Sequence, residues 1–181
     1  MIMHKYPDLL ETKHLILRPV KAGDATDIFE YAGDEENTRF MIFNTHKSID
    51  ETVAFIDYIT KLQNTVPHYA LVLKENNKLI GCGGIMDVSN FPHCGAIGYI
   101  LNKKYWGLGY TAEAMKAIID YLFKNKLVHR IEACHFTENE SSGRVMQKLG
   151  MIYEGTSKDK LFIRGKYITV KNYAIINNEL S

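Results

Sequence analysis

The residues best suited to chemistry form a glycine-rich segment in the middle of the chain, Lys104–Thr111, with the sequence KYWGLGYT. Its two glycines permit positive φ angles and let the backbone approach a ligand without a Cβ clash. A helix is predicted to follow, and backbone amides at its N-terminus would meet an anion where the helix dipole adds partial positive charge. The amides in question belong to Gly107, Gly109, Tyr110 and Thr111. The segment therefore predicts a phosphate site, although Gly-x-Gly is also compatible with a simple tight turn.

Two other phosphate-binding motifs do not fit. The chain has no G-x-x-x-x-G-K-[ST] sequence, so a Walker loop is excluded. A dinucleotide fingerprint prefers a third glycine where Ala112 stands, and it follows the first strand of a parallel sheet. Because an antiparallel meander is predicted before this segment, a Rossmann site is disfavoured.

The elements that must position the segment alternate along the chain without a linker or repeat. Strands are expected at His14–Val20, His68–Lys74, Lys78–Asp87, Ala96–Leu101, Arg130–Phe136, Met151–Thr156 and Tyr167–Ile176. Helices are expected after Asp24, which would cap the first of them, after Ser48 in a capping box with Glu51, at Thr111–Asn125 and at Ser141–Leu149. This order predicts a mixed α/β (α+β-like) sheet with helices on both faces.

Composition places the chain among globular proteins. It has 181 residues, 46% of them hydrophobic and 24% charged, which predicts a single domain over residues 1–181 with a core at about 10–176. The net charge of +1 argues against direct nucleic-acid binding. Three cysteines without C-x-x-C spacing argue against a disulfide framework or a zinc ribbon. Without a membrane-spanning stretch or signal peptide, a cytoplasmic protein with no membrane partner is expected, and a homodimer is compatible with the sequence.

Several spaced motifs together resemble the GNAT acetyltransferase superfamily. Its cofactor loop has the form [Q/R]-x-x-G-x-[G/A], matched here by Lys104, Gly107 and Gly109, with lysine in place of the usual glutamine or arginine. Three tracts resemble the ribosomal-protein N-terminal acetyltransferase (RimJ/RimL-like) branch: Leu15-x-Leu17-Arg18, Gly98-Tyr99-Ile100 through Glu113-Ala114, and Asn139-x-x-Ser142 through Glu154-Gly155. The resemblance covers about Leu10 to Ile175, nearly the whole chain.

The resemblance implies a GNAT-like domain, with a mostly antiparallel sheet splayed after Leu101, and acetyl-CoA as co-substrate, with no metal. Backbone groups of the strand end would pair with pantetheine, those of Ile100, Leu101 and Asn102. Amides of the following loop would hold the pyrophosphate, those of Trp106, Gly107, Leu108, Gly109, Tyr110 and Thr111. Lys104 would add a positive charge, and the Asn139 side chain would bind the pantetheine arm.

The implied reaction is direct attack of an amine on the thioester in a ternary complex, with a backbone amide near Ile100 stabilising the oxyanion. The superfamily commonly protonates the leaving thiolate with a tyrosine seven residues after the asparagine, where this chain has Met146. The branch suggests Ser142 as the donor instead. A serine in the first turn of a helix is also compatible with a purely structural role.

Glu132 is the candidate general base, because its strand is expected to flank the cofactor cleft. A cross-strand ion pair with Arg130 or Lys166 is the alternative. Asp87 and His135 are further candidates at strand ends. The branch commonly has an aspartate near the last strand, where this chain has a threonine at position 169.

A site without an obvious base favours an α-amine. Deprotonation at pH 7 costs about 1 kcal/mol for an α-amine but about 4.6 kcal/mol for a lysine. The leading prediction is acetyl transfer to the N-terminal α-amine of a protein or peptide, such as a ribosomal protein. The alternatives are a small-molecule amine acceptor, such as a polyamine or aminoglycoside, and a catalytically silent acyl-CoA-binding module.

Overall fold

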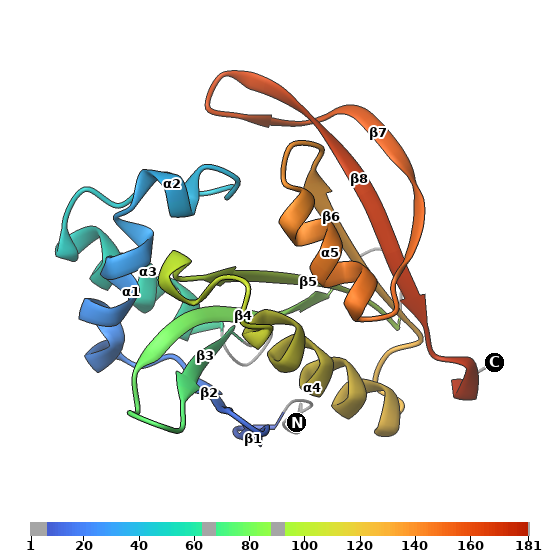
Figure 1. Ribbon diagram of the computed structural model, residues 1–181, viewed down its shortest axis with the longest axis horizontal. Coiled ribbons are helices and arrows are strands. Elements are labelled where there is room, and N and C mark those ends of the chain that lie inside the picture. Colours follow the sequence, from blue (N-terminus) through green and yellow to red (C-terminus); the bar gives the residue numbers. More distant parts are fainter. Residues whose placement is uncertain (1–6, 63–67, 88–92, 181) are drawn as a thin grey trace.

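An eight-stranded sheet organises the molecule, with the strand order β1-β2-β3-β4-β5-β6-β8-β7 (Figure 1). The computed structural model describes residues 7–62, 68–87 and 93–180. The strands are β1 (Leu10–Glu11), β2 (Leu15–Pro19), β3 (His68–Leu73), β4 (Leu79–Asp87), β5 (Cys94–Leu101), β6 (Arg130–Phe136), β7 (Ile152–Ile163) and β8 (Lys166–Ile176). The α-helices are α1 (Ala25–Ala32), α2 (Glu35–Thr38), α3 (Ile49–Leu62), α4 (Tyr110–Lys124) and α5 (Glu140–Lys148). Short 3-10 turns are η1 (Ala22–Asp24), η2 (Lys103–Tyr105) and η3 (Asn178–Leu180).

The sheet splits between β5 and β6, its one parallel pair. These strands pair only from Cys94 with Arg130 to Ala96 with Glu132. Beyond that point β5 stays with β4 and β6 stays with β8, so each strand follows its own antiparallel partner. The predicted splay is confirmed, but it begins after Ala96 rather than after Leu101. We call the space between residues 97–101 of β5 and residues 133–136 of β6 the opening.

Helices cover both faces of the sheet, as predicted. On one face α4 and α5 pack against a core that includes Leu17, Ile97, Ile131 and Met146. On the other face α1 and α3 enclose a second cluster that includes Val72. Figure 1 shows α4 and α5 on the side of the sheet opposite α1 and α3. Because β5 alternates, Tyr99 packs with the α4–α5 core whereas Ile100 packs with the α1–α3 cluster.

The last hairpin is longer than the sequence predicts. β7 was expected to end at Thr156, but it continues to Ile163 through a register shift between Ser157 and Leu161. The sequence does not indicate a strand here because three charged residues, Lys158, Asp159 and Lys160, break the apolar alternation. The turn itself places Arg164 at φ 51° and Gly165 at φ 75°, the positive φ pair of a tight hairpin.

The predicted cap at Asp24 is wrong. Asp24 precedes α1 but makes no side-chain cap bond. Its carboxylate instead accepts hydrogen bonds from both terminal guanidinium nitrogens of Arg18, at 2.8 and 2.7 Å, and from the Lys21 amide. An arginine on the neighbouring strand thus outcompetes the weaker amide donors of the helix, because charge-assisted bonds are stronger. The Ser48 cap is confirmed by the bond from the Glu51 amide to Ser48 Oγ.

Candidate active site

Asn102, which follows the last residue of β5, already has both of its backbone polar groups hydrogen-bonded. The Asn102 amide donates to Ile80 O at 2.8 Å, and Asn102 O accepts from the Tyr105 amide at 2.9 Å. Asn102 is also buried, so its backbone is not available to pantetheine, which corrects the prediction for this residue.

The backbone N–H and C=O groups of β5 alternate in direction, and this decides which of them face the opening. In an antiparallel pair every second residue directs its N–H and C=O to the partner strand. Because Asn102 bonds to β4, Ile100 does so as well, opposite Cys82. The backbone groups of Tyr99 and Leu101 therefore face the opening. Of the predicted pantetheine partners only Leu101 has an amide with the required direction, and the amide near Ile100 that the oxyanion needs belongs to Tyr99 or Leu101.

Asn37, which the sequence analysis missed, holds the end of β5 in place. Its Nδ2 donates to Leu101 O at 3.0 Å, and its Oδ1 accepts from the Lys103 amide at 2.7 Å. Trp106 Nε1 donates to the same Leu101 oxygen at 2.8 Å. The asparagine of α2 and the tryptophan of the loop thus fix the bend between β5 and the glycine-rich segment.

The glycine-rich segment has the predicted conformation. Gly107 and Gly109 have φ angles of 80° and 86°, and nothing lies within 4 Å of the Cβ position at either. The first helical hydrogen bond of α4 runs from the Glu113 amide to Gly109 O. The amides of residues 110–112 therefore precede the hydrogen-bonded turns and point off the N-terminus of α4. This arrangement can hold an anion such as a pyrophosphate.

Trp106 departs from its predicted role, and Lys104 lies beside a carboxylate. The Trp106 amide donates to Lys103 O at 3.2 Å, so this amide is occupied and the indole ring serves to anchor the loop. The Lys104 ammonium lies 3.4 Å from a carboxylate oxygen of Glu30 on α1. Its side chain is 64% exposed, so it is free to exchange this pairing for a phosphate. Leu108 is exposed at the tip of the loop.

Ser142 and Tyr99 connect the two sides of the opening. The hydroxyl oxygens of Tyr99, on β5, and Ser142, on α5, lie 2.9 Å apart. The Tyr99 hydroxyl also lies 3.2 Å from Ser142 O, to which it can donate. Burial raises the pKa of Tyr99 to about 12, so its hydroxyl stays protonated across the physiological range. Tyr99 lies within the tract that carries the family resemblance, yet no chemical role was predicted for it.

Asn139 is the N-cap of α5. Its Oδ1 accepts from the Ser142 amide at 3.3 Å and from the Ser141 hydroxyl at 2.9 Å. The cap uses the oxygen of the side chain, which leaves the Nδ2 hydrogens as the donors that can bind a pantetheine carbonyl. Asn139 therefore positions Ser142 whether or not it also contacts a ligand.

Glu132, the candidate base, lies in an ion pair. Its Oε1 accepts from Arg130 Nε at 2.7 Å, and Arg130 also bonds to Glu154 on β7. The hydrogen bonds that Arg130 donates to the carboxylates of Glu154 and Glu132 together raise its pKa. Glu132 stands opposite Ala96, where β5 and β6 are still paired. The ion pair with Arg130 that the sequence left open is thus present, but it lies within β6 and not across strands, and the carboxylate lies at the closed end of the opening.

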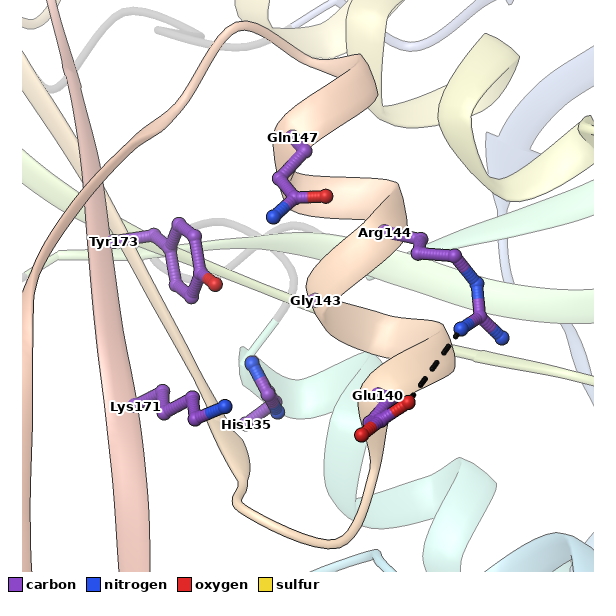
Figure 2. A pocket seen from close by; sticks show the side chains of 7 residues that line it. All are labelled: His135, Glu140, Gly143, Arg144, Gln147, Lys171 and Tyr173. Carbon is purple, nitrogen blue, oxygen red and sulfur yellow. Dashed lines mark ion pairs between the residues drawn. The ribbon is translucent and has the colours of Figure 1, made fainter.

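Of the other two base candidates, His135 lies against α5 and β8. His135 is buried, with Nδ1 2.8 Å from Phe136 O, and a Cβ on Gly143 would lie 2.8 Å from its Nε2. It lines a cavity of about 180 Å³ between α5, β6 and β8 (Figure 2). The Asp87 side chain lies outside the described residues. Within the described ranges no three His, Cys, Asp or Glu side chains form a metal-binding group.

An arch spans the open end of the site. The loop after α2 touches β6 through the edge-on contact of Phe40 with Phe136, with ring centroids 5.9 Å apart. At the tip of the β7–β8 hairpin, the Arg164 guanidinium donates to acceptors in this loop: Thr38 O, Arg39 O, Met41 O, Phe43 O and Asn44 Oδ1. Figure 1 shows the hairpin curving above the sheet toward α2. Residues 38–44 thus form one side of a closed arch.

Position 169 carries no carboxylate of its own, but one lies beside it. Thr169 Oγ1 lies 3.4 Å from an oxygen of Asp159 and accepts from the Asp159 amide at 3.2 Å. Asp159 belongs to the irregular part of β7, with φ 51°.

No helix of residues 7–62, 68–87 and 93–180 has the length and apolar character needed to cross a membrane.

Comparisons with known proteins agree with this geometry. The model of the acetyltransferase (GNAT) domain matches residues 14–152. The [ribosomal protein uS5]-alanine N-acetyltransferase of Escherichia coli is 31% identical over 168 residues, which cover 87% of this chain and 85% of that protein. An uncharacterized N-acetyltransferase of Bacillus licheniformis, p20, is 28% identical over 95% of this chain and 98% of that protein.

The fold comparison gives the same result. The crystal structure of ribosomal-protein-S5-alanine acetyltransferase from Vibrio fischeri superposes with a TM-score of 0.78 at 27% identity, over 96% of this chain and 98% of that one. The residues that the family model matches include the glycine-rich loop and both strands of the opening, β5 and β6. The chain therefore belongs to the GNAT family of N-acetyltransferases, enzymes that take their acetyl group from acetyl-CoA.

Proposed function

We propose that this enzyme acetylates the N-terminal α-amine of a protein. The observation that carries the proposal is the 31% identity to the uS5-alanine N-acetyltransferase, which extends over 87% of this chain. A ribosomal protein is the class of acceptor that this similarity suggests. The loop and the two strands of the opening would bind acetyl-CoA, with the amides of Gly107, Gly109, Tyr110 and Thr111 at the pyrophosphate.

The chemistry of the site supports an α-amine over a lysine. A lysine side chain has an ordinary pKa near 10.4, so its deprotonation at pH 7 costs about 4.6 kcal/mol, against about 1 kcal/mol for an α-amine. The carboxylate predicted to accept this proton, Glu132, is held by Arg130. A neutral α-amine makes up an appreciable fraction of the acceptor at pH 7 to 8, and water can then take the proton that it loses.

The arch supports an extended acceptor. Its two sides are the loop after α2 and the β7–β8 hairpin. Arg164 of the hairpin joins them by donating hydrogen bonds to backbone carbonyls on the α2 side. A chain terminus can thread beneath such an arch, whereas a lysine on a folded surface must bring its own backbone close to the hairpin. The amine would then approach the thioester from the end of the opening near Phe136.

Arg164→Ala tests the role of the arch. It removes the donors that hold the hairpin to the loop, so we expect the KM for a peptide acceptor to rise about fivefold to twentyfold, with the KM for acetyl-CoA within twofold. Lys166→Ala, at an exposed residue of the same hairpin, is the matched control and should change neither constant. An unchanged acceptor KM in Arg164→Ala would show that the arch does not shape the acceptor site.

A panel of acceptors tests the proposed function. Release of free CoA would be followed with peptides that begin with Ala, Ser or Met, with the same peptides blocked at the α-amine, and with polyamines and aminoglycosides. The proposal predicts the highest kcat/KM for an unblocked peptide and loss of turnover on blocking. A polyamine or aminoglycoside as the best acceptor would replace it with the small-molecule alternative, and no turnover with any acceptor would favour an acyl-CoA-binding module.

A further inference from the structure

The Tyr99–Ser142 contact is a polar link between β5 and α5 within the core that the two elements share. Tyr99 lies on β5, three residues beyond the last residue that pairs with β6, and Ser142 lies in the first turn of α5. The two hydroxyl oxygens are 2.9 Å apart. Tyr99 also has its backbone directed into the opening, where the thioester is expected. The hydroxyl pair therefore lies beside the reacting atoms if acetyl-CoA occupies the opening.

Two hydroxyls at this distance have two arrangements of their protons. In the first, Tyr99 donates to Ser142 O, which lies 3.2 Å away, and the Ser142 hydroxyl donates to Tyr99. In the second, Tyr99 donates to Ser142 Oγ, and the serine proton is free for a third group. An acceptor that carries negative charge near Ser142 favours the second arrangement, because charge-assisted hydrogen bonds are the stronger ones.

We propose that Tyr99 is a positioning residue for acetyl transfer: its hydroxyl donates to Ser142 Oγ and thereby turns the serine proton toward the departing thiolate. In the step concerned, the amine nitrogen forms a bond to the carbonyl carbon and the carbon–sulfur bond breaks. The electron pair of that bond leaves on sulfur, which takes the Ser142 proton, and the proton that the amine nitrogen loses returns through water to Ser142. The inference rests on the proposed role of Ser142 in this reaction.

Tyr99 is suited to donate a hydrogen bond and unsuited to give up its proton. Burial raises its pKa to about 12, well above the value near 8.5 that is ordinary for a thiol. Tyr99 therefore stays protonated and available as a hydrogen-bond donor. Its hydroxyl lies against Ser142 Oγ, so its effect passes through the serine, and position 146, where the superfamily has its tyrosine acid, holds Met146, buried in the core.

The test is a double-mutant cycle with Tyr99→Phe, Ser142→Ala and the double variant, in single-turnover experiments with the best acceptor. Tyr99→Phe should slow acetyl transfer roughly threefold to thirtyfold, with the dissociation constant for acetyl-CoA within twofold. The double variant should be no slower than Ser142→Ala, because the phenol has no further partner to position. Tyr31→Phe is the matched control, since its hydroxyl donates to Cys82 Sγ on the opposite face of the sheet, and it should transfer at the unaltered rate.

Each other outcome overturns the inference in a distinguishable way. If Tyr99→Phe transfers at full rate while Ser142→Ala is slow, Tyr99 does not position Ser142 and the proposed role of Ser142 stands. If both variants transfer at full rate, the role of Ser142 fails as well. If the double variant is slower than Ser142→Ala by the whole Tyr99→Phe factor, Tyr99 acts independently of the serine. An equal loss in Tyr31→Phe would mean that removing any buried phenol has the same effect.

Discussion

Gly109→Val binds acetyl-CoA about tenfold to a hundredfold more weakly than the unaltered chain. Gly109 has a φ angle of 86° immediately before α4. A β-branched residue at this angle costs about 1–3 kcal/mol, so the loop leaves the conformation in which its amides converge. The new methyl groups also enter the space around position 109, which is open in the structure and which a pyrophosphate would occupy. Calorimetric titration with acetyl-CoA measures the effect.

Gly150→Val is the matched control, because it imposes the same backbone strain away from the loop. Gly150 follows α5 with a φ angle of 79°, and its Cβ would meet only Ile175 Cδ1 at an ordinary 3.7 Å. We expect a lower melting temperature and an unchanged dissociation constant for acetyl-CoA. Unchanged affinity in a folded Gly109→Val variant would mean that the glycine-rich loop is only a turn.

Ser142→Ala lowers kcat about tenfold to a hundredfold with little change in the KM for acetyl-CoA. A hydroxyl that donates to the departing thiolate contributes in the transition state and not in the ground state, so its loss appears in kcat. We place the effect at the low end of general acid catalysis because the CoA thiol, with an ordinary pKa near 8.5, is a good leaving group. Steady-state kinetics with the best acceptor measures both constants.

Substitutions of Asn139 are expected to change stability and the KM for acetyl-CoA instead of kcat. Because its Oδ1 caps α5, Asn139→Ala loses about 1 kcal/mol of stability in addition to any contact with pantetheine. Asn139→Asp separates the two effects, since aspartate is an equally good cap but lacks the Nδ2 donors. We expect it to keep the melting temperature and to raise the KM for acetyl-CoA with kcat nearly constant. Full kcat in Ser142→Ala, with chemistry shown to be rate-limiting, would leave water as the proton source.

The sequence predicted the parts of the fold that local patterns encode. The meander, the helix after the glycine-rich segment and the positive φ angles at Gly107 and Gly109 follow from alternation, helical periodicity and the absence of a Cβ. The far half of β7 was missed because Lys158, Asp159 and Lys160 interrupt the apolar alternation of the strand. In the structure they belong to an exposed strand whose polarity carries no information about pairing.

The site was harder to predict because its decisive contacts join distant residues. Asn37 meets Leu101 across 64 positions and Tyr99 meets Ser142 across 43, and neither spacing leaves a local pattern. Backbone direction decides which strand-end amides serve the opening, and this depends on the β4–β5 register. For this reason Leu101 keeps an amide that faces the opening, whereas the amides of Asn102 and Trp106 are already bonded.

The position of the acetyl group on a peptide that carries two amines tests the proposed function most directly. A peptide that begins with alanine and contains one internal lysine would be incubated with the enzyme and acetyl-CoA, and the modified residue located by tandem mass spectrometry. The expected product carries its acetyl group on the α-nitrogen of the alanine and leaves the lysine free. Acetylation of the lysine, or an unmodified peptide under conditions in which a polyamine is acetylated, would contradict the account.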